Sequence, residues 1–147
     1  MYRLIFILAF FLSLNGPATA EDETQALLNR GYEQTQAGQL DEALDTLQLA
    51  VNKAPDSSLA YTRLGGVRLL RQEYTDGIKD FQQAISLDQT NAVAFIGMSV
   101  AYLHMSQYSL ARAALDEAVR IDPSRKPEID KVVAWIEQRS KGTGSIH

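Results

Sequence analysis

The chain contains no cysteine. This absence excludes disulfides, thiol catalysis, thiolate metal sites and lipid attachment through an N-terminal cysteine. Histidine is nearly as scarce, with two residues, and there are only four prolines. The formal charge of −4 argues against nucleic acid or an anionic lipid surface as the main partner, because both require a cationic face. What remains, 147 residues of which 46% are hydrophobic, is the composition of one ordinary globular domain.

Catalytic chemistry finds little support in the sequence. His147 is the last residue, and His104 has no serine, cysteine or acidic motif nearby that would form a nucleophile or a metal site. Adjacent acidic residues such as Asp116 and Glu117 point in different directions on a helix, so they do not form an acid/base pair. No glycine-rich phosphate-binding loop occurs. We therefore expect a protein without enzyme activity, metal or cofactor.

The first twenty residues have the pattern of a secretory signal peptide. Arg3 precedes an apolar run over residues 4–11, a helix-breaking Asn-Gly-Pro follows at 15–17, and residues 18–20 read Ala-Thr-Ala. This pattern predicts cleavage after Ala20 and a periplasmic or secreted mature chain. The alternative is an uncleaved anchor, but a helical run of about eleven apolar residues covers only half of a bilayer's hydrocarbon core. We expect no stable membrane span after cleavage.

The rest of the chain repeats with a period of 34 residues. Gly38 to Ala43 aligns without gaps with Gln72 to Gly77 and with Ser106 to Ala111. Apolar and small residues stay in register through all three copies. The equivalent positions include Leu40, Tyr74 and Tyr108; Leu47, Phe81 and Leu115; Ala50, Ala84 and Ala118; and Gly31, Gly65 and Ser99. Each copy carries two amphipathic stretches of helical length around a short turn. The copies are 24–57, 58–91 and 92–125, and together they span residues 24–125.

This pattern resembles the tetratricopeptide repeat (TPR) family. The middle copy carries the family's sequence of large, small and aromatic residues. Its matching positions are Tyr61, Leu64, Gly65, Tyr74, Gly77, Phe81 and Ala84. The resemblance implies an all-α, right-handed α-solenoid of three helix pairs, in which small residues such as Gly65 and Gly77 let the two helices of a pair approach closely. Stacking the pairs then makes one continuous core.

The two ends of the solenoid are expected to be capped. Arg30 stands where the later copies have apolar residues, so the outer side of the first copy is polar. Residues 126–140 carry an apolar stripe from Ile129 to Ile136 and predict a C-terminal capping helix, followed by a flexible tail at 141–147. Gln89 replaces the proline that closes the other copies, so we expect the second helix of the middle copy to run on or to turn less sharply.

In the TPR family the first helices of successive repeats line a concave groove, and the resemblance places fifteen residues there. Nine of them are Leu, Ile, Val or Tyr, which is more apolar than a solvated face requires. The candidate binding residues are Leu28, Tyr32, Leu59, Thr62, Gly66, Leu69, Leu70, Val93, Ile96, Val100, Leu103 and His104. Gly66 would leave a hollow at the centre. The lysines and asparagines with which some TPR domains hold a terminal carboxylate are missing, and Arg63 is the one possible charge contact.

These features predict an exported module whose groove docks a peptide or an amphipathic helix of a partner protein, within a secretion, pilus or envelope-assembly system. Two alternatives use the same apolar surface. The protein could self-associate into a homo-oligomer, with Trp135 at the contact, or act as a periplasmic holdase for unfolded chains. A further alternative is that the chain's own capping helix covers the groove.

Overall fold

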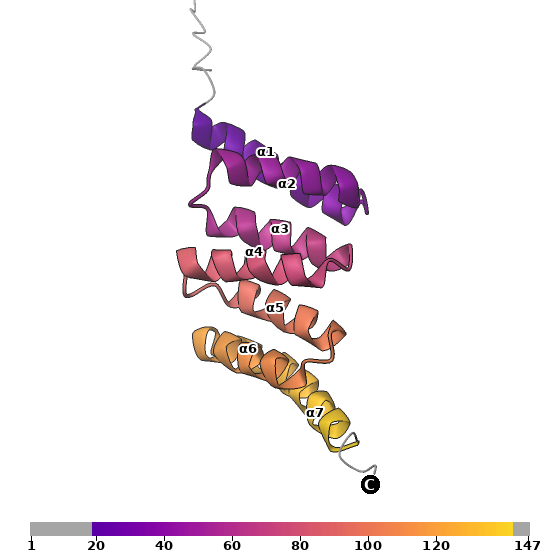
Figure 1. Cartoon of the computed structure of the whole chain (residues 1–147). Helices are drawn as coiled ribbons and strands as arrows, with labels where there is room; N and C mark the ends of the chain where they lie inside the picture. Colours follow the sequence, from indigo (N-terminus) through magenta and orange to yellow (C-terminus); the bar gives the residue numbers. More distant parts are fainter. Residues whose placement is uncertain (1–18, 143–147) are drawn as a thin grey trace, which may run out of the picture.

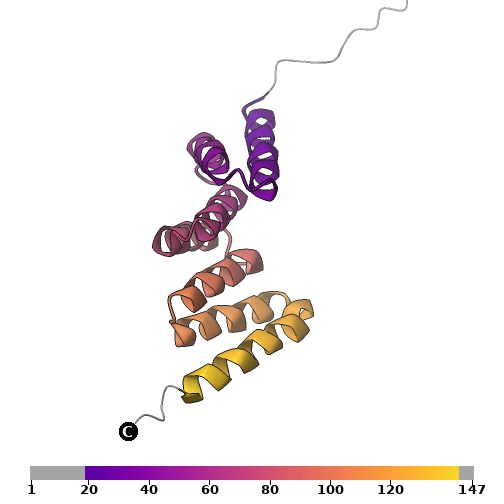
Figure 2. The same ribbon diagram turned by 90° about the vertical axis from the view of Figure 1, so that its right-hand side faces the viewer.

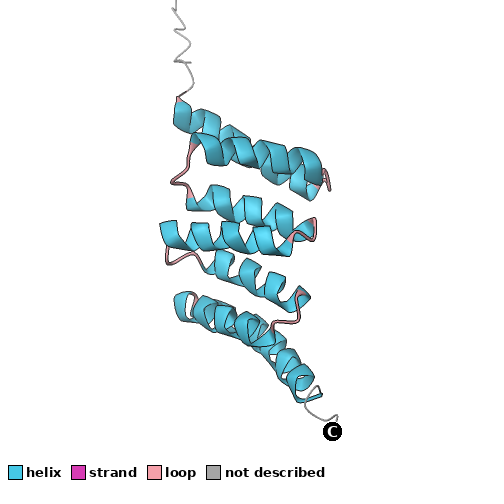
Figure 3. Ribbon diagram, in the orientation of Figure 1, coloured by secondary structure: helices cyan, strands magenta, loops and turns pink. Residues whose placement is uncertain are grey.

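The computed structural model describes residues 19–142, and every regular element in this range is helical (Figure 3). The predicted all-α fold class is confirmed. The predicted signal peptide lies outside the described residues except for Thr19 and Ala20, and so do residues 143–147 of the predicted tail. The elements are α1 (Ala20–Gln36), α2 (Leu40–Lys53), α3 (Ser58–Leu70), α4 (Tyr74–Leu87), α5 (Ala92–His104), α6 (Tyr108–Ile121), the 3₁₀ turn η1 (Pro123–Arg125) and α7 (Lys126–Gly142).

The helices stack in chain order into a solenoid, with α1 at one end and α7 at the other (Figures 1 and 2). They form the pairs α1/α2, α3/α4 and α5/α6. The first helices of successive pairs contact each other, α1 against α3 and α3 against α5, whereas the second helices α2, α4 and α6 do not. The stack therefore curves with its first helices on the inner side, where the groove was predicted.

The turn inside each pair has the same backbone geometry at 34-residue intervals. Gly38, Gln72 and Ser106 adopt the left-handed conformation, with φ of 75°, 65° and 58°. In each case the next residue donates its N–H to the carbonyl five positions earlier, for example Gln39 to Gln34 at 2.9 Å. This bond pattern closes the first helix of the pair. The left-handed conformation is natural for Gly38 and costs Gln72 and Ser106 about 1 kcal/mol or more each.

One of the two outcomes expected at the end of the middle pair is wrong. Without a proline at position 89 we expected α4 to run on or to turn less sharply, but it does not run on, since it ends at Leu87, at the same point of the repeat as α2 and α6. The carboxylate of Asp88 accepts hydrogen bonds from the backbone N–H and the hydroxyl of Thr90, at 2.9 and 2.7 Å. This side-chain turn ends the helix in place of a proline, because Asp offers the backbone an alternative to helical bonding.

Small residues bring the two helices of a pair together, as predicted. A Cβ added to Gly65 would lie 3.1 Å from the carbonyl oxygen of Gly77, and one added to Gly77 would lie equally close to the carbonyl of Gly65. In the first pair, a Cβ at Gly31 would come within 2.6 Å of the buried Leu47 side chain. Any larger residue at these positions would force the helices apart.

The two ends of the stack differ from its middle. Arg30 is exposed on the first helix, in agreement with the expected polar outer face. At the other end α7 occupies the place of a further first helix and runs two residues beyond the predicted 126–140. It packs on α6 and η1, with Ile129 and Ile136 buried.

Candidate binding groove

The twelve candidate residues are exposed to very different degrees. Five are exposed: Tyr32, Leu59, Leu70, Val93 and His104. Five are half-buried: Gly66, Leu69, Ile96, Val100 and Leu103. Leu28 and Thr62 are buried in the stack and present little surface to a ligand. The exposed apolar members are large, with Tyr32 at 52%, Leu70 at 57% and Val93 at 52% of full exposure. A Cβ added to Gly66 would meet nothing within 4 Å, so the surface is open at that point.

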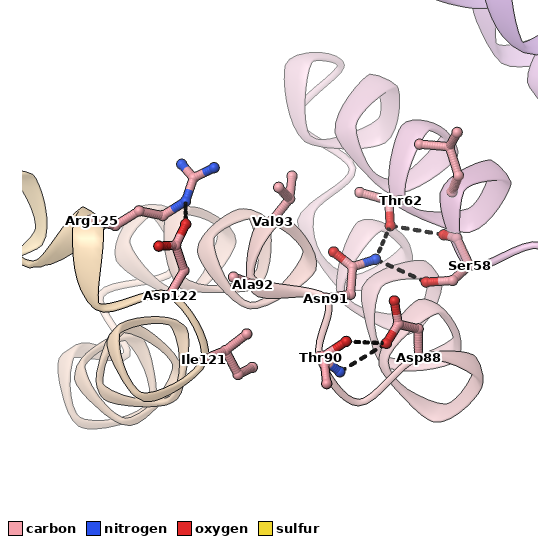
Figure 4. Close-up of a pocket in the computed structure, with 11 residues that line it drawn as sticks. Ser58, Thr62, Asp88, Thr90, Asn91, Ala92, Val93, Ile121, Asp122 and Arg125 are labelled. Atoms are coloured by element: carbon pink, nitrogen blue, oxygen red, sulfur yellow. Dashed lines mark hydrogen bonds and ion pairs between the residues drawn. The ribbon is translucent and has the colours of Figure 1, made fainter.

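A cleft of about 620 Å³ with both polar and apolar lining lies between the starts of α3 and α5 (Figure 4). Asn91 crosses it, donating its side-chain N–H groups to the hydroxyls of Ser58 at 2.9 Å and Thr62 at 2.8 Å. The side-chain oxygen of Asn91 accepts from the backbone N–H of Ala94 at 3.0 Å and so caps α5. Leu59 and Val93 also line this cleft. Asn91 thus joins the second and third repeats through its side-chain hydrogen bonds.

A second cavity of about 240 Å³ lies between α5, α6 and α7 and is almost entirely apolar. Three candidate residues, Ile96, Val100 and Leu103, line it together. The remaining lining residues are Ser99, Leu115, Arg125, Glu128, Ile129 and Val132. Ile96 and Leu103 also pack against the apolar cluster that includes Ile129 and Ile136. The capping helix therefore contacts part of the predicted groove and forms one wall of a pocket there.

Arg63, the predicted charge contact, lies between α1 and α3. Its guanidinium donates to the backbone carbonyl of Leu28 at 2.5 Å and lies 5.4 Å from the ring centroid of Tyr32. Arg68 and Arg71 are ion-paired, Arg68 with Asp80 and Arg71 with Asp41 and Glu73. Within residues 19–142, Arg63 forms no ion pair with a carboxylate. Its charge is therefore available to a ligand.

Aromatic contacts mark both margins of the groove. The ring of His104 stacks on that of Tyr74, with centroids 4.8 Å apart and planes 8° apart. Trp135 on α7 is 41% exposed, meets Tyr108 edge to face at 6.1 Å, and has the guanidinium of Arg139 4.7 Å from its ring centroid. His104 is thus held by stacking on Tyr74, and Trp135 packs against Tyr108 and Arg139 while part of its side chain stays exposed.

Asp80 is the most perturbed acid in the described part of the chain. It is only 8% exposed, on α4, at a position where the other copies have Thr46 and Ala114. Burial raises the pKa of this carboxyl to about 6, against the opposing charge of Arg68. Arg68 Nη1 lies 3.2 Å from Asp80 Oδ2, but the two groups are not aligned for a hydrogen bond. Oδ2 has no hydrogen-bond partner in the described structure.

Across residues 19–142, no cluster of three or more His, Asp or Glu side chains is placed to hold a metal ion. In the same range none of the helices combines the length and the apolar character that crossing a bilayer requires.

Sequence reasoning missed the residues that complete the groove from outside the first helices. Leu115, Ile129 and Val132 were assigned to the core or to the capping stripe, yet they form the floor and far wall of the apolar pocket. The clue was present in one column of the repeat, where Phe81 is followed by the smaller Leu115. Asn91 was also missed, because a bridging role depends on the distance between two repeats.

Comparison with known proteins agrees with this architecture. A family model described as tetratricopeptide repeat matches residues 68–136, slightly under half of the chain. The first TPR of Spaghetti (RPAP3), solved bound to an HSP90 peptide, superposes with a TM-score of 0.78 at 16% identity, covering 86% of this chain and 99% of that one. The TPR2B domain of yeast Sti1, in its pHsp70 complex, gives 0.76 at 20% identity, covering 80% and 98%.

A bacterial structure is equally similar. The type III secretion translocator chaperone SycD of Yersinia enterocolitica superposes with a TM-score of 0.77 at 16% identity, over 84% of this chain and 88% of that one. At identities of 16–20%, the similarity to these structures shows a shared fold and nothing more. The chain therefore has the fold of TPR domains, and the match of residues 68–136 to the family model supports its assignment to the tetratricopeptide repeat family.

Proposed function

We propose that this protein is an exported interaction module that binds a segment of a partner protein in its inner groove and carries out no chemistry. One observation supports this above the others: Tyr32, Leu59, Leu70 and Val93 leave large apolar surfaces exposed along the row of first helices. Large apolar side chains that stay exposed on one row of helices often mark an interaction site. The row belongs to three successive pairs, so a peptide or a helix could contact all of them.

The structural neighbours support the same proposal. Two are TPR domains in complexes with HSP90 or Hsp70 ligands, and a third is a secretion chaperone for translocator proteins. By analogy we propose that the partner is a protein of a secretion, pilus or envelope-assembly system. Recognition would use apolar contacts more than the carboxylate contacts of a basic groove, because no lysine occupies the twelve groove positions.

Photo-crosslinking in the source cells tests the groove. A benzophenone amino acid at Leu70 or Val93 should give an adduct of one defined partner, identified by mass spectrometry. The same residue at Leu49 or Leu110, which are exposed on second helices, is the matched control and should give none. Equal adducts from both sets of positions, or adducts with many unrelated chains, would contradict a specific groove. The second pattern would favour a holdase.

Export is tested at the chain terminus. We propose that residues 1–20 are removed, so mass spectrometry of the protein recovered from outside the cytoplasm should find a chain that begins at Glu21. Such a cut would remove Thr19, whose hydroxyl accepts from the N–H of Asp22 at 3.1 Å and whose own N–H donates to the Asp22 carboxylate at 2.9 Å. Recovery of an intact chain in the cytoplasm would oppose export.

Self-association is the second candidate, because the indole of Trp135 is exposed beside α6. Sedimentation equilibrium at tens of micromolar should then show a dimer or a larger species, and Trp135→Ser should convert it to a monomer. A wild-type chain that stays monomeric removes this candidate and leaves the groove free for a partner.

A further inference from the structure

The middle interface of the solenoid is filled by one aromatic ring. Phe81 on α4 is 2% exposed. A Cβ at Gly65, in its own pair, would touch the ring at 3.0 Å, and a Cβ at Gly97, on the first helix of the next pair, would overlap it. The ring therefore occupies all the space between α3, α4 and α5, and two glycines on opposite sides make room for it.

The next interface uses the same columns with different residues. Leu115 replaces Phe81, Ser99 replaces Gly65, and Lys131 replaces Gly97. Leu115 is smaller than a phenylalanine, and the Lys131 side chain is exposed to solvent, so neither residue fills the volume that the ring fills in the middle interface. The first helices are also spaced differently at the two interfaces: α3 approaches within 8 Å of α5 between Cα atoms, but α7 does not come that close to α5 in the described structure.

The apolar pocket lies at this position, between Leu115 and the facing sides of α5 and α7. Its volume of about 240 Å³ exceeds the roughly 150 Å³ of an apolar cavity known to accept benzene. The rim carries one charge of each sign, Arg125 and Glu128, and Arg125 is paired with Asp122 at 3.0 Å. Selection in the pocket therefore depends on shape and apolar character.

The charges along the groove indicate the chemistry of the rest of the ligand. None of the twelve groove residues is acidic, although the chain as a whole is. Arg63 is half-buried between α1 and α3, and within residues 19–142 it has no carboxylate partner. Neighbouring helix axes lie about 8–10 Å apart, and two such spacings, roughly 16–20 Å, separate the Arg63 guanidinium between α1 and α3 from the pocket between α5 and α7. About five to six residues of extended chain span that distance.

We infer that the pocket between α5 and α7 is an anchor site for one phenylalanine side chain of the partner segment, and that Arg63 pairs with a carboxylate about five to six residues away on the same segment. This inference rests on the proposed function, since it names the kind of segment that the groove would hold. Burying a phenyl ring in a preformed apolar pocket would supply a binding hot spot.

Peptide titration tests the ligand chemistry directly. The probes are short blocked Ala/Ser peptides with Phe and Glu about five or six positions apart, in both orders, and binding is followed by methyl NMR of the purified protein. Binding should shift the methyl signals of Ile96, Val100 and Ile129, and replacing Phe by Ala should weaken the affinity roughly 10- to 100-fold. Replacing Glu by Gln should weaken it about 3- to 10-fold and reduce the salt dependence. Equal affinities for the Phe and Ala peptides would overturn the inference.

Filling the pocket tests the site. Leu115→Phe restores the ring of the middle interface, so the Phe peptide should lose at least about tenfold in affinity while the melting temperature stays the same or rises. Leu110→Phe, the same substitution at an exposed position of α6, is the control and should bind like the wild type. If Leu115→Phe does not fold, Val132→Trp blocks the mouth of the pocket from α7 instead. Undiminished binding in a folded variant of either kind contradicts the anchor site.

Crosslinking separates this inference from the proposed function. With the photoreactive residue at Val93, outside the pocket, the Leu115→Phe variant should yield about tenfold less partner adduct than the wild type. An undiminished adduct would reject the anchor and leave groove docking intact. No adduct even from the wild type would instead reject the proposed function.

Discussion

The interface between the second and third helix pairs is filled by a phenyl ring, whereas the equivalent interface between the third pair and α7 holds an open apolar pocket. Both are built from the same columns of a 34-residue repeat. In the first, Phe81 meets Gly97, and Ile78 beside it is buried. In the second, Leu115 faces the α7 side and the residue equivalent to Ile78 is Arg112, which is exposed and ion-paired with Glu137.

This difference shows how a repeat protein can form a pocket without a new element. The fold requires each pair to bury its apolar face against the next, and a closed interface stabilises the stack. At the third interface, the smaller Leu115 lies beside a cavity that faces the groove. Stability and recognition are therefore competing uses of one position, and substitutions that alter the two interfaces should separate them.

The largest expected effect is at Gly97. Gly97→Ala should destabilise the fold by about 2–3 kcal/mol, because the new methyl group overlaps the ring of Phe81 in a packed interior. Gly66→Ala is the matched control in the neighbouring first helix. Its Cβ meets nothing within 4 Å, so the usual helix preference for alanine should stabilise the protein by about 0.5–1 kcal/mol. Urea unfolding of the two variants measures both, and equal signs would contradict the close packing at Gly97.

The second-largest effect is expected at Asn91, whose side chain joins α3 and α5 at the filled interface. Asn91→Ala removes the cap of α5 and two hydrogen bonds to α3, at Ser58 and Thr62 (Figure 4). The loss of a cap alone costs about 1 kcal/mol, so we expect about 2 kcal/mol in total. Asn91→Asp retains the cap acceptor but cannot donate to the hydroxyls, and should fall between alanine and the wild type. A cost no larger than that of Ser57→Ala, which removes only the cap of α3, would mean that the bridge adds nothing.

Asp80 provides a pH-dependent difference between the middle and third pairs, since Ala114 occupies its position in the third. Its pKa is raised above the ordinary value of 3.8 to about 6, so the folded state binds this proton more tightly than the unfolded state. The resulting stability is fully present below about pH 3.8 and is lost as the pH rises through about 6. From pH 7 to pH 5 the wild type should gain about 1 kcal/mol from this group.

Asp80→Asn removes that dependence and should be about 2 kcal/mol more stable than the wild type at pH 7. The charged groups around Asp80 are Arg68 on α3 and Asp76 and Lys79 on α4. Hydrogen bonding to Lys79 lowers the pKa of Asp76, so Asp76 stays ionised in this window. Thermal unfolding at pH 5, 6 and 7 measures the difference between the two proteins. A difference that does not change with pH would show that Asp80 titrates normally.

Much of the fold could be predicted from the repeat, because helix pairing depends on residues that recur in each copy. Gly65 and Gly77 show this, since both lie at the predicted close contact. The end of α4 could not be predicted from the missing proline, because Asp88 and Thr90 form a local turn with the same effect. The stacking of Arg63 on Tyr32 and the pocket behind Leu115 depend on side chains from different repeats. A sequence pattern gives the type of each of those residues, but it does not give the distances between their side chains.

The smallest expected effect concerns the contact that holds the open interface. Arg112 pairs with Glu137 on α7, and both side chains are nearly half exposed, so the pair is screened by water and salt. Glu137→Gln should leave global unfolding almost unchanged but increase the amide exchange of α7 relative to α5, and 1 M salt should produce the same increase in the wild type. Ile78→Ala, at the position equivalent to Arg112, is the contrasting variant, because it removes a buried side chain and should destabilise the fold by about 2–4 kcal/mol with no salt dependence. If Glu137→Gln instead lowers global stability as much as Ile78→Ala does, α7 is as firmly packed as a regular repeat, and the pocket beside it is a rigid part of the core.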